Sequence, residues 1–218
     1  ERALENESYR STVSVEEVKE ALGKLSLGKS VGYDKIPAEM YFFGKETSLV
    51  VLLTWIIDSM FSSGYIPEDF NIALITPIVK TDKPTNDPAD FRPISVSTTL
   101  SLVFENIIRN KISLSVHSNQ FGFKPRTSTK MAYFVLNETV NYYSNNGAKC
   151  WVASLDATKA FDRMWRCGLF FKLIDKIPDV IWRILRNYYK SSEAAVRIGG
   201  SVSEKFRVLE GVKQGGVI

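Results

Sequence analysis

The sequence predicts a mixed α+β fold. Stretches with apolar residues at helical spacing are interspersed with short apolar runs typical of strands. These runs lead into a hairpin or a long excursion, which favours α+β over a regular series of parallel β-α-β units. The 218 residues, 44% hydrophobic and 24% charged, are ordinary for a globular protein and contain no repeat, low-complexity tract or linker.

Two helices are predicted in the first third of the chain. The first covers residues 15–25, because Ser14 and Glu17 form a capping box ahead of apolar residues at helical spacing. A loop, GKSVGYDKIP, follows, since its glycines and proline are incompatible with a regular helix. A largely buried helix is predicted over 49–61, with Gly64 as its stop signal. This apolar run is too short to cross a bilayer, so no membrane partner is expected.

The middle of the chain alternates strand and helix signals. The run IALITPIV at 72–79 predicts a strand, and Pro77 places it at a sheet edge or a bulge. The polar segment TDKPTNDPAD predicts a loop because it is dense in turn residues. Apolar residues then resume helical spacing over 100–114, and after a further loop over 129–143.

The last third begins with a predicted strand, WVASLD, at 151–156. A helix over 167–174 follows, and then a second helix opened by Pro178. The inward face of the second helix is expected to consist of Ile181, Ile184, Leu185 and Tyr188. AAVRI, a two-glycine turn and EKFRVL predict a hairpin over 194–209.

Charge and cysteine content narrow the classes of protein only mildly. The net charge of +4 permits a polyanionic partner without requiring one. Cys150, Cys167 and the single His117 form no metal-binding pattern, so a transition-metal site is not expected. No secretory signal is visible, and reduced thiols with an intracellular location are the expectation.

Residues 23–30 match the nucleotide-binding pattern GxxxxGKS in full. That motif requires a strand before its glycines and a helix beginning at its lysine, because loop amides and a helix N-terminus hold the phosphates. Here a predicted helix precedes the glycines, and glycine and proline follow the lysine. A P-loop hydrolase is therefore a minor alternative.

Asp156 ends the strand predicted at 151–156. A carboxylate at the end of a strand is held by a rigid backbone, which suits the octahedral oxygen coordination that Mg²⁺ requires. A lone aspartate at such a position is more often a cap or turn residue. Further motifs are needed to favour the metal.

Asp156 lies in one of five sequence blocks that can be taken together as such motifs. In chain order the blocks are GYDKIPAEM from Gly32, ITPIVKTDKP with DFRPISVST from Ile75 to Thr98, QFGFKPRTST from Gln120, LDATKAFD from Leu155, and GVKQGGVI from Gly211. In this order they resemble the reverse transcriptases of non-LTR (LINE-type) retrotransposons. The resemblance implies an RNA-directed DNA polymerase with a right-hand fold, and thus an RNA template, a DNA primer and dNTP as partners.

The resemblance also implies a division of the chain. Residues 1–70 correspond to an N-terminal extension with the early reverse-transcriptase block, residues 71–150 to the fingers, and residues 151–218 to part of the palm. The aromatic-Ala-Asp-Asp hairpin of the family does not occur in the sequence. The chain is therefore expected to be a fragment, truncated before that hairpin and the thumb, and inactive alone.

In the family, the first aspartate of LDATKAFD binds catalytic metal. The resemblance assigns Asp156 as the catalytic ligand of two Mg²⁺ ions, with the backbone carbonyl of Ala157 as a further ligand. The second set of carboxylates is expected outside this chain. Asp162 is interpreted as a structural neighbour, because adjacent side chains leaving a turn do not easily converge on one ion.

Residues in three of the blocks are expected to bind the incoming nucleotide. Lys80 and Arg92 stand where the resemblance places contacts to the triphosphate; exposed loop cations are the alternative for both. Phe161 is expected to exclude a ribose 2′-hydroxyl, although a core role is the common fate of phenylalanine. Gln214 and Gly215 are expected to border the base and sugar, with glycine allowing close backbone approach.

The QFGFKPRTST block interleaves cations with aromatic side chains. Phosphate neutralisation and base stacking would suit these residues to a single-stranded template. The expected template-binding residues are Phe121, Phe123, Lys124, Arg126 and Lys130. Solvated loop charges remain an equal alternative, and a nucleic-acid-binding remnant without catalysis remains an alternative for the whole chain.

Overall fold

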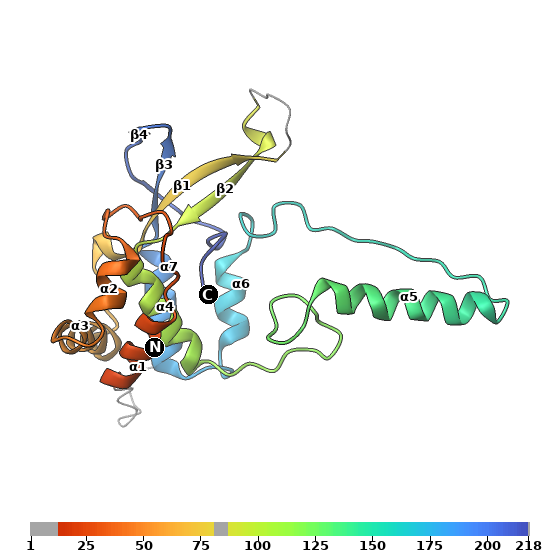
Figure 1. Ribbon diagram of the computed structural model, residues 1–218, viewed down its shortest axis with the longest axis horizontal. Helices are drawn as coiled ribbons and strands as arrows, with labels where there is room; N and C mark the ends of the chain where they lie inside the picture. Colours follow the sequence, from red (N-terminus) through yellow and green to blue (C-terminus); the bar gives the residue numbers. More distant parts are fainter. Residues whose placement is uncertain (1–12, 81–86, 218) are drawn as a thin grey trace. The chain divides into compact units, whose positions relative to one another are not determined.

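The structure is a computed structural model that describes residues 13–80 and 87–217 (Figure 1). These residues form two units: one from residues up to 113 and from 159 onward, and one from Leu114–Thr158. The expected mixture of helices and sheet is confirmed. The predicted division of the chain at residues 70 and 150 stays a prediction.

The first unit contains most of the helices. They are α1 (Val15–Gly23), α2 (Ala38–Gly44), α3 (Leu49–Ser63), α4 (Thr99–Lys111), α6 (Arg166–Leu173) and α7 (Asp179–Lys190), with a short 3-10 turn, η1 (Glu68–Asn71). The capping box is confirmed, because Ser14 Oγ accepts from the amide of Glu17 at 3.1 Å while Glu17 accepts from the amide of Ser14 at 2.8 Å. Gly64 ends α3 in the left-handed conformation, as expected for a stop signal. Among these elements α2 and the 3-10 turn η1 were not predicted, since seven and four residues are too few to show a clear period.

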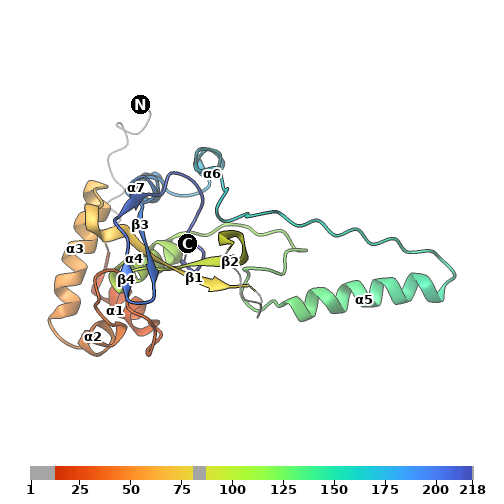
Figure 2. The same cartoon turned by 90° about the horizontal axis from the view of Figure 1, so that it is seen from above.

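The sheet of the first unit joins distant parts of the chain (Figure 2). Its strands are β1 (Ile72–Val79), β2 (Phe91–Val96), β3 (Glu193–Ile198), β4 (Ser201–Val202) and β5 (Phe206–Arg207). The order is β2-β1-β3-β4, and β5 also pairs with β3. β1 is antiparallel to β2 and parallel to β3, with Ile72 opposite Glu193. This parallel pairing brings the last part of the chain beside β1.

Pro77 lies where β1 has a strand on one side only. The parallel pairing with β3 ends at Ile75, whereas the antiparallel pairing with β2 continues through Pro77 to Val79. A missing backbone N–H is tolerated at such a place because no strand on the β3 side requires it. The strand as a whole lies between β2 and β3, so the edge position expected from the sequence holds only for its last residues, from Thr76 to Val79.

The predicted hairpin is present but interrupted. Gly199 and Gly200 separate β3 from the two-residue β4, as expected. Ser203 then leaves the ladder, and its Oγ accepts from the amide of Val196 at 2.9 Å. β5 resumes pairing with β3, with Phe206 opposite Ala194. The second half of the hairpin is therefore two short strands and not the continuous run expected.

The core of the first unit lies among α1, α3, α4 and α7. Phe104 is fully buried, and its ring centroid lies 5.6 Å from that of Phe61, 5.3 Å from that of Phe70 and 5.6 Å from that of Tyr188. The inward face expected for α7 is confirmed, since Ile181, Ile184, Leu185 and Tyr188 are all buried. Helical spacing alone identified this face.

The N-terminal part of the first unit has neither the secondary structure of a P-loop nor a single helix that could span a membrane, among the residues described. The GxxxxGKS segment follows α1, and residues 24–37 contain no helix, so the strand and helix that a P-loop needs are both missing there. Among the described helices none is long and apolar enough by itself to cross a membrane; α2 and α3 pass such a test only as a pair bent by 108°.

The second unit consists of loops around α5 (Thr129–Asn145). Ser128 caps this helix, since its Oγ accepts from the amide of Met131 at 3.4 Å. The predicted helix at 129–143 is thus confirmed, and it ends at Asn145 with Asn146 as its C-cap. None of the residues of α5 is buried.

The strand predicted at 151–156 is wrong: these residues have no regular secondary structure. Trp151 is 92% exposed and Leu155 is fully exposed. A strand is stabilised by hydrogen bonds to a neighbouring strand and by burial of its apolar face. Within the part of the chain that the structure describes, no strand pairs with this segment.

Replacing Phe104 by alanine tests the centre of the core. Phe104→Ala is expected to lower the free energy of unfolding by about 3–5 kcal/mol, because it leaves a cavity among three aromatic rings. Urea denaturation of the 218-residue chain measures the loss. Phe171 is 75% exposed, so Phe171→Ala is the control and should cost about 0.5 kcal/mol or less. Equal losses in the two variants would contradict this core.

Candidate nucleotide site around the QG segment

The sequence block GVKQGGV at residues 211–217, called the QG segment, is fixed in the first unit by backbone hydrogen bonds. The amide of Val212 donates to the carbonyl of Phe161 at 2.8 Å, and the amide of Gly211 donates to the carbonyl of Met164 at 2.9 Å. On its other side, the amide of Ser95 in β2 donates to the carbonyl of Gln214 at 3.1 Å. Two predicted nucleotide-binding residues, Phe161 and Gln214, therefore lie in one part of the molecule.

Glycine is required at two positions of the QG segment. Gly211 has φ +76°, and a Cβ there would lie 2.6 Å from the carbonyl oxygen of Phe161 and 2.7 Å from that of Asp162. Gly215 has φ +107°, and its Cβ would lie 3.2 Å from the carbonyl oxygen of Ser95. The turn at residues 161–163 is called the Phe161 turn. Because Gly211 and Gly215 have no side chains, the QG segment can contact the backbone of both the Phe161 turn and β2 closely.

Arg166, at the start of α6, holds the first residue of the QG segment, Gly211, by a hydrogen bond. Its Nε donates to the carbonyl of Gly211 at 2.8 Å, and its Nη1 donates to the carbonyls of Tyr189 at 2.7 Å and Val208 at 2.6 Å. Burial lowers the pKa of this guanidinium from its ordinary value, whereas Tyr189 and Glu210 oppose the shift. Sequence reasoning missed Arg166, because no motif or spacing distinguishes it from a surface arginine.

A cleft of about 170 Å³ lies where the QG segment meets the sheet. Ala73 of β1, Pro93 and Ser95 of β2, Asp162 and Gln214 are among its lining residues. Ligand pockets usually measure about 300–1,000 Å³. The cleft is therefore too small to enclose a nucleoside triphosphate, and a bound nucleotide would extend beyond it.

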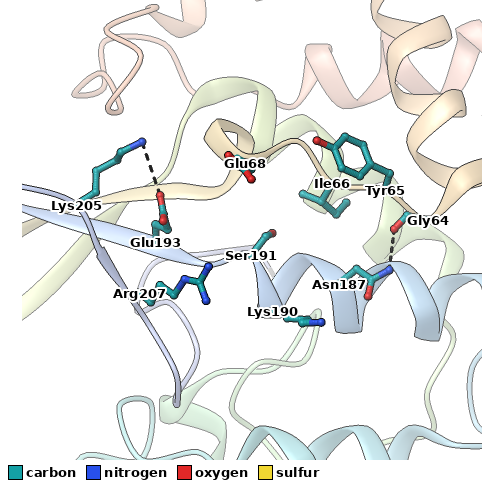
Figure 3. Close-up of a pocket in the computed structure, with 10 residues that line it drawn as sticks. All are labelled: Gly64, Tyr65, Ile66, Glu68, Asn187, Lys190, Ser191, Glu193, Lys205 and Arg207. Atoms are coloured by element: carbon teal, nitrogen blue, oxygen red, sulfur yellow. Dashed lines mark hydrogen bonds and ion pairs between the residues drawn. The ribbon is translucent and has the colours of Figure 1, made fainter.

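A larger cleft of about 530 Å³ lies between the loop after α3, the end of α7 and the strands β3 and β5 (Figure 3). None of the predicted site residues lines it. Its Lys205 is already paired, at 2.8 Å with Asp69 and at 3.8 Å with Glu193. This charge balance favours no particular ligand.

Lys80 and Arg92 lie in the strand region of the first unit. The amide of Lys80 donates to the carbonyl of Asp90 at 2.9 Å, which closes the β1–β2 connection. Arg92 is exposed in β2 and pairs with Ile78. Because side chains alternate along a strand, Arg92 lies on the face opposite to Pro93 and Ser95, which line the small cleft. The contacts of Lys80 and Arg92 to a triphosphate stay a prediction.

Asp156 and Ala157 belong to the second unit, where both are exposed in an extended segment. Within residues 13–80 and 87–217, no group of three or more His, Cys, Asp or Glu side chains is placed to hold a metal ion. One carboxylate and one carbonyl supply fewer oxygen ligands than octahedral Mg²⁺ takes. These residues alone therefore do not form a magnesium site.

Four of the predicted template-binding residues occupy the turn that leads into α5, and the fifth, Lys130, lies in the first turn of that helix. Thr127 organises this turn, because its hydroxyl donates to the carbonyls of Phe121 at 2.7 Å and Lys124 at 2.8 Å. Phe123 and Arg126 adopt left-handed backbone conformations, with φ 57° and 61°. Phe123 is 93% exposed. The turn thus presents an aromatic ring and cations to solvent, although contact with a template stays a prediction.

A protein-family model described as "Reverse transcriptase (RNA-dependent DNA polymerase)" matches residues 78–218, nearly two thirds of the chain. The chain belongs to the reverse transcriptase family. The matched region contains the β1–β2 connection, α5, the Phe161 turn and the QG segment. The family that the sequence blocks indicated is thereby confirmed.

Individual relatives of this reverse transcriptase chain come from mobile elements. It is 28% identical over 209 residues to "Probable RNA-directed DNA polymerase from transposon X-element" of Drosophila melanogaster, covering 93% of this chain and 23% of the relative. It is also 28% identical over 215 residues to "RNA-directed DNA polymerase from mobile element jockey" of the same species, covering 95% and 23%. The chain therefore spans about a quarter of the length of these relatives, which confirms the resemblance to non-LTR elements over part of their sequence.

Members of the reverse transcriptase family generally use divalent metal ions. In this member, the residues of the nucleotide blocks divide between the two units: Phe161 and Gln214 in the first, Asp156 in the second. Cys150 and Cys167 are both exposed, and no disulfide joins them in the part of the chain that the structure describes.

Replacing Gly211 by alanine tests the close approach of the QG segment to the Phe161 turn. Gly199→Ala is the matched control, because Gly199 also has a positive φ, +59°, but its Cβ would meet no atom within 4 Å. The control should lose about 1 kcal/mol of unfolding free energy from backbone strain. Gly211→Ala should lose about 1–3 kcal/mol more, because its Cβ collides with two carbonyl oxygens. Equal losses by urea denaturation would contradict the approach.

Proposed function

We propose that this chain forms the fingers and part of the palm of a right-hand polymerase that copies RNA into DNA from a primer 3′-hydroxyl. The observation that carries the proposal is the match of residues 78–218 to the reverse transcriptase family. The hydrogen bond between Val212 and Phe161 adds support, because it brings two of the proposed nucleotide contacts together. The proposed partners are an RNA template, a DNA primer and dNTP.

In this proposal Asp156 is the catalytic metal ligand, and the carbonyl of Ala157 assists it. Two divalent ions would stabilise the attacking and leaving oxygens of the phosphoryl group when bound. Two such ions require more ligands than these residues supply, so further carboxylates are proposed to come from a segment outside these 218 residues. The extended backbone around Asp156 is proposed to become a strand when that segment pairs with it.

The nucleotide is proposed to lie against the QG segment. Phe161, which is 38% exposed, would present its ring edge to the sugar and exclude a 2′-hydroxyl. Gln214 and Gly215 would border the base and sugar. The small cleft that Gln214 lines would hold part of the nucleotide, and the rest would lie outside it. Lys80 and Arg92 are proposed to contact the triphosphate, where charge develops. Because Arg92 lies on the face of β2 opposite to the small cleft, this contact requires the triphosphate to extend past β2, the outer strand of the sheet.

The turn before α5 is proposed to bind the single-stranded template. Lys124 and Arg126 of this turn and Lys130 at the start of α5 would neutralise phosphates, and Phe121 and Phe123 would stack on bases. The proposed site of action is intracellular, in the cytoplasm or the nucleus, where a mobile element finds its RNA and its target DNA. A remnant that binds nucleic acid without catalysis is the alternative that the first experiment distinguishes.

Replacing Asp156 by asparagine in the full-length protein tests the catalytic assignment. Asp156→Asn should lower primer extension at least about a hundredfold, because an amide is a poor substitute for a carboxylate metal ligand. Template affinity, measured by fluorescence anisotropy, should change little. Asp175→Asn, at an exposed aspartate outside the proposed site, is the control and should stay active. The 218-residue chain alone should show no extension, and full activity of Asp156→Asn would refute the assignment.

Replacing Phe161 by valine tests the sugar contact. Phe161→Val should lower the discrimination of dNTP against the corresponding ribonucleotide by about tenfold or more, because the smaller side chain leaves room for the 2′-hydroxyl. Single-nucleotide incorporation kinetics give the two kcat/KM values. Phe171→Val, at a position 75% exposed on α6, is the control. Unchanged discrimination in Phe161→Val would show that the ring does not contact the sugar.

A further inference from the structure

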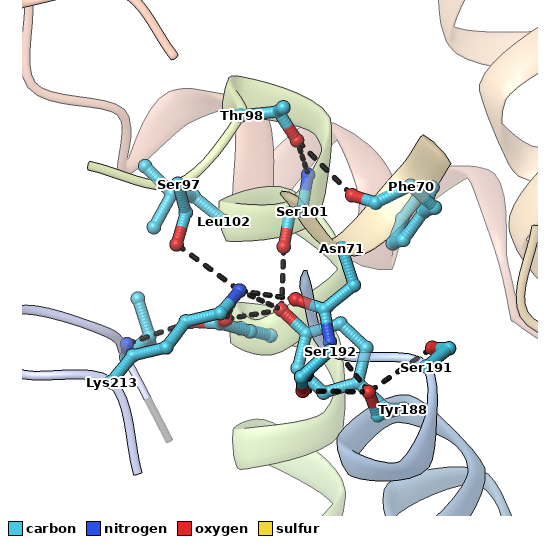
Figure 4. A network of polar contacts seen from close by, with 12 residues as sticks. Phe70, Asn71, Ser97, Thr98, Ser101, Leu102, Tyr188, Ser191, Ser192 and Lys213 are labelled. Carbon is cyan, nitrogen blue, oxygen red and sulfur yellow. Dashed lines mark hydrogen bonds and ion pairs between the residues drawn. The ribbon is translucent and has the colours of Figure 1, made fainter. Parts of the chain in front are cut away.

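The side chain of Lys213, within the QG segment, turns inward (Figure 4). It is only 12% exposed. Its Nζ donates to Asn71 Oδ1, to Tyr188 Oη at 3.0 Å and to Ser97 Oγ at 3.4 Å, and lies 3.7 Å from Glu105 Oε1. Burial lowers the pKa of this ammonium from 10.5 to about 8, although Glu105 opposes the shift.

Glu105 of α4 is the carboxylate at the centre of these contacts. It is 1% exposed and accepts from Tyr188 Oη at 2.5 Å. Its other oxygen accepts from the amide of Val217 at 2.7 Å. The same buried carboxylate therefore holds the QG segment at two points, through the ammonium of Lys213 and through the backbone of Val217.

Only three residues, Gln214, Gly215 and Gly216, lie between these two anchors. The amide of Gly216 donates to the carbonyl of Lys213 at 3.3 Å, which turns the backbone between them. Two of the three are the proposed contacts to base and sugar. The anchors thus restrict the part of the segment that would meet the nucleotide.

The groups that receive Lys213 come from separate parts of the first unit. Asn71 lies in η1, Ser97 follows β2, and Tyr188 lies in α7. Asn71 also donates to the carbonyl of Tyr188 and to Ser192 Oγ, at 2.5 and 3.1 Å. Among the described residues, every buried side-chain nitrogen and oxygen has a hydrogen-bond partner. With Lys213 in place, the polar network of the receiving site is therefore complete.

A buried ion pair is a poor source of stability, because the loss of hydration offsets the attraction. A complete polar network does, however, define one geometry, since any shift leaves a buried group unpaired. The Lys213–Glu105 pair is therefore better suited to fixing the position of the QG segment than to raising the stability of the fold.

We propose that Lys213 and Glu105 are positioning residues for the nucleotide site. By tying both ends of Gln214–Gly216 to α4, they set where Gln214 and Gly215 stand against the incoming nucleotide. The inference rests on the proposed polymerase function for its catalytic consequence, but the tether itself is a property of the 218-residue chain.

Hydrogen–deuterium exchange of the 218-residue chain tests the tether. In Lys213→Met the amides of Ser95 and Val217 should exchange at least about tenfold faster, whereas those in the centre of α4 should keep their protection. If Lys213→Met does not fold, the double variant Glu105→Gln/Lys213→Met decides, because it leaves no unpaired buried charge. Unchanged exchange at both amides in the folded variant overturns the inference.

Steady-state kinetics of the full-length protein test the consequence. Lys213→Met, or the double variant, should raise the KM for dNTP about tenfold and change kcat less than about threefold, as expected for a displaced substrate contact. Lys205→Met, at a partly exposed lysine outside the QG segment, is the control and should match the wild type. An unchanged KM in an active variant overturns the positioning role. An inactive wild-type protein would instead contradict the proposed function and leave the exchange experiment to decide the tether.

Discussion

The packing and hydrogen bonding of the buried Tyr188 side chain are the interactions on which the structure of the first unit depends. Its ring packs against Phe104 in the apolar core, whereas its hydroxyl, 2.5 Å from Glu105, belongs to the polar network below the QG segment. Burial and the nearby Glu105 carboxylate raise the pKa of this phenol well above its ordinary value, so it stays a neutral donor. One residue thus links hydrophobic packing, which sets stability, to hydrogen bonding, which sets local geometry.

The QG segment shows how weak local structure becomes precisely placed. Its glycines would make it flexible in isolation, because they restrict φ and ψ little. In the folded unit it is held by Ser95, the Phe161 turn, Arg166 and Glu105. Each contact joins residues far apart in the sequence. Substrate sites that consist of backbone need this kind of support, since their own side chains offer no packing.

The metal-binding part of the proposed site has the opposite character. Asp156 is exposed, and nearby apolar side chains in the same segment, such as that of Leu155, are also exposed and pack against no core. A carboxylate becomes a good ligand for a hard cation when its backbone is fixed and other oxygen ligands surround it. The proposed pairing with a further segment would supply both conditions, and it would also bury the apolar side chains that precede Asp156.

The sequence by itself determined the longer helices and the family. Caps such as Ser14 and periodic faces such as that of α7 act over a few residues, and the motif blocks need only their order to indicate a reverse transcriptase. The tertiary structure decided the pairing of β1 with β3, the roles of Arg166 and Lys213, and the lack of a strand at 151–156. These features depend on partners up to 142 residues away, as in the contact of Lys213 with Asn71. No local pattern specifies such a partner, because hydrogen bonds and burial are satisfied only once the chain has folded.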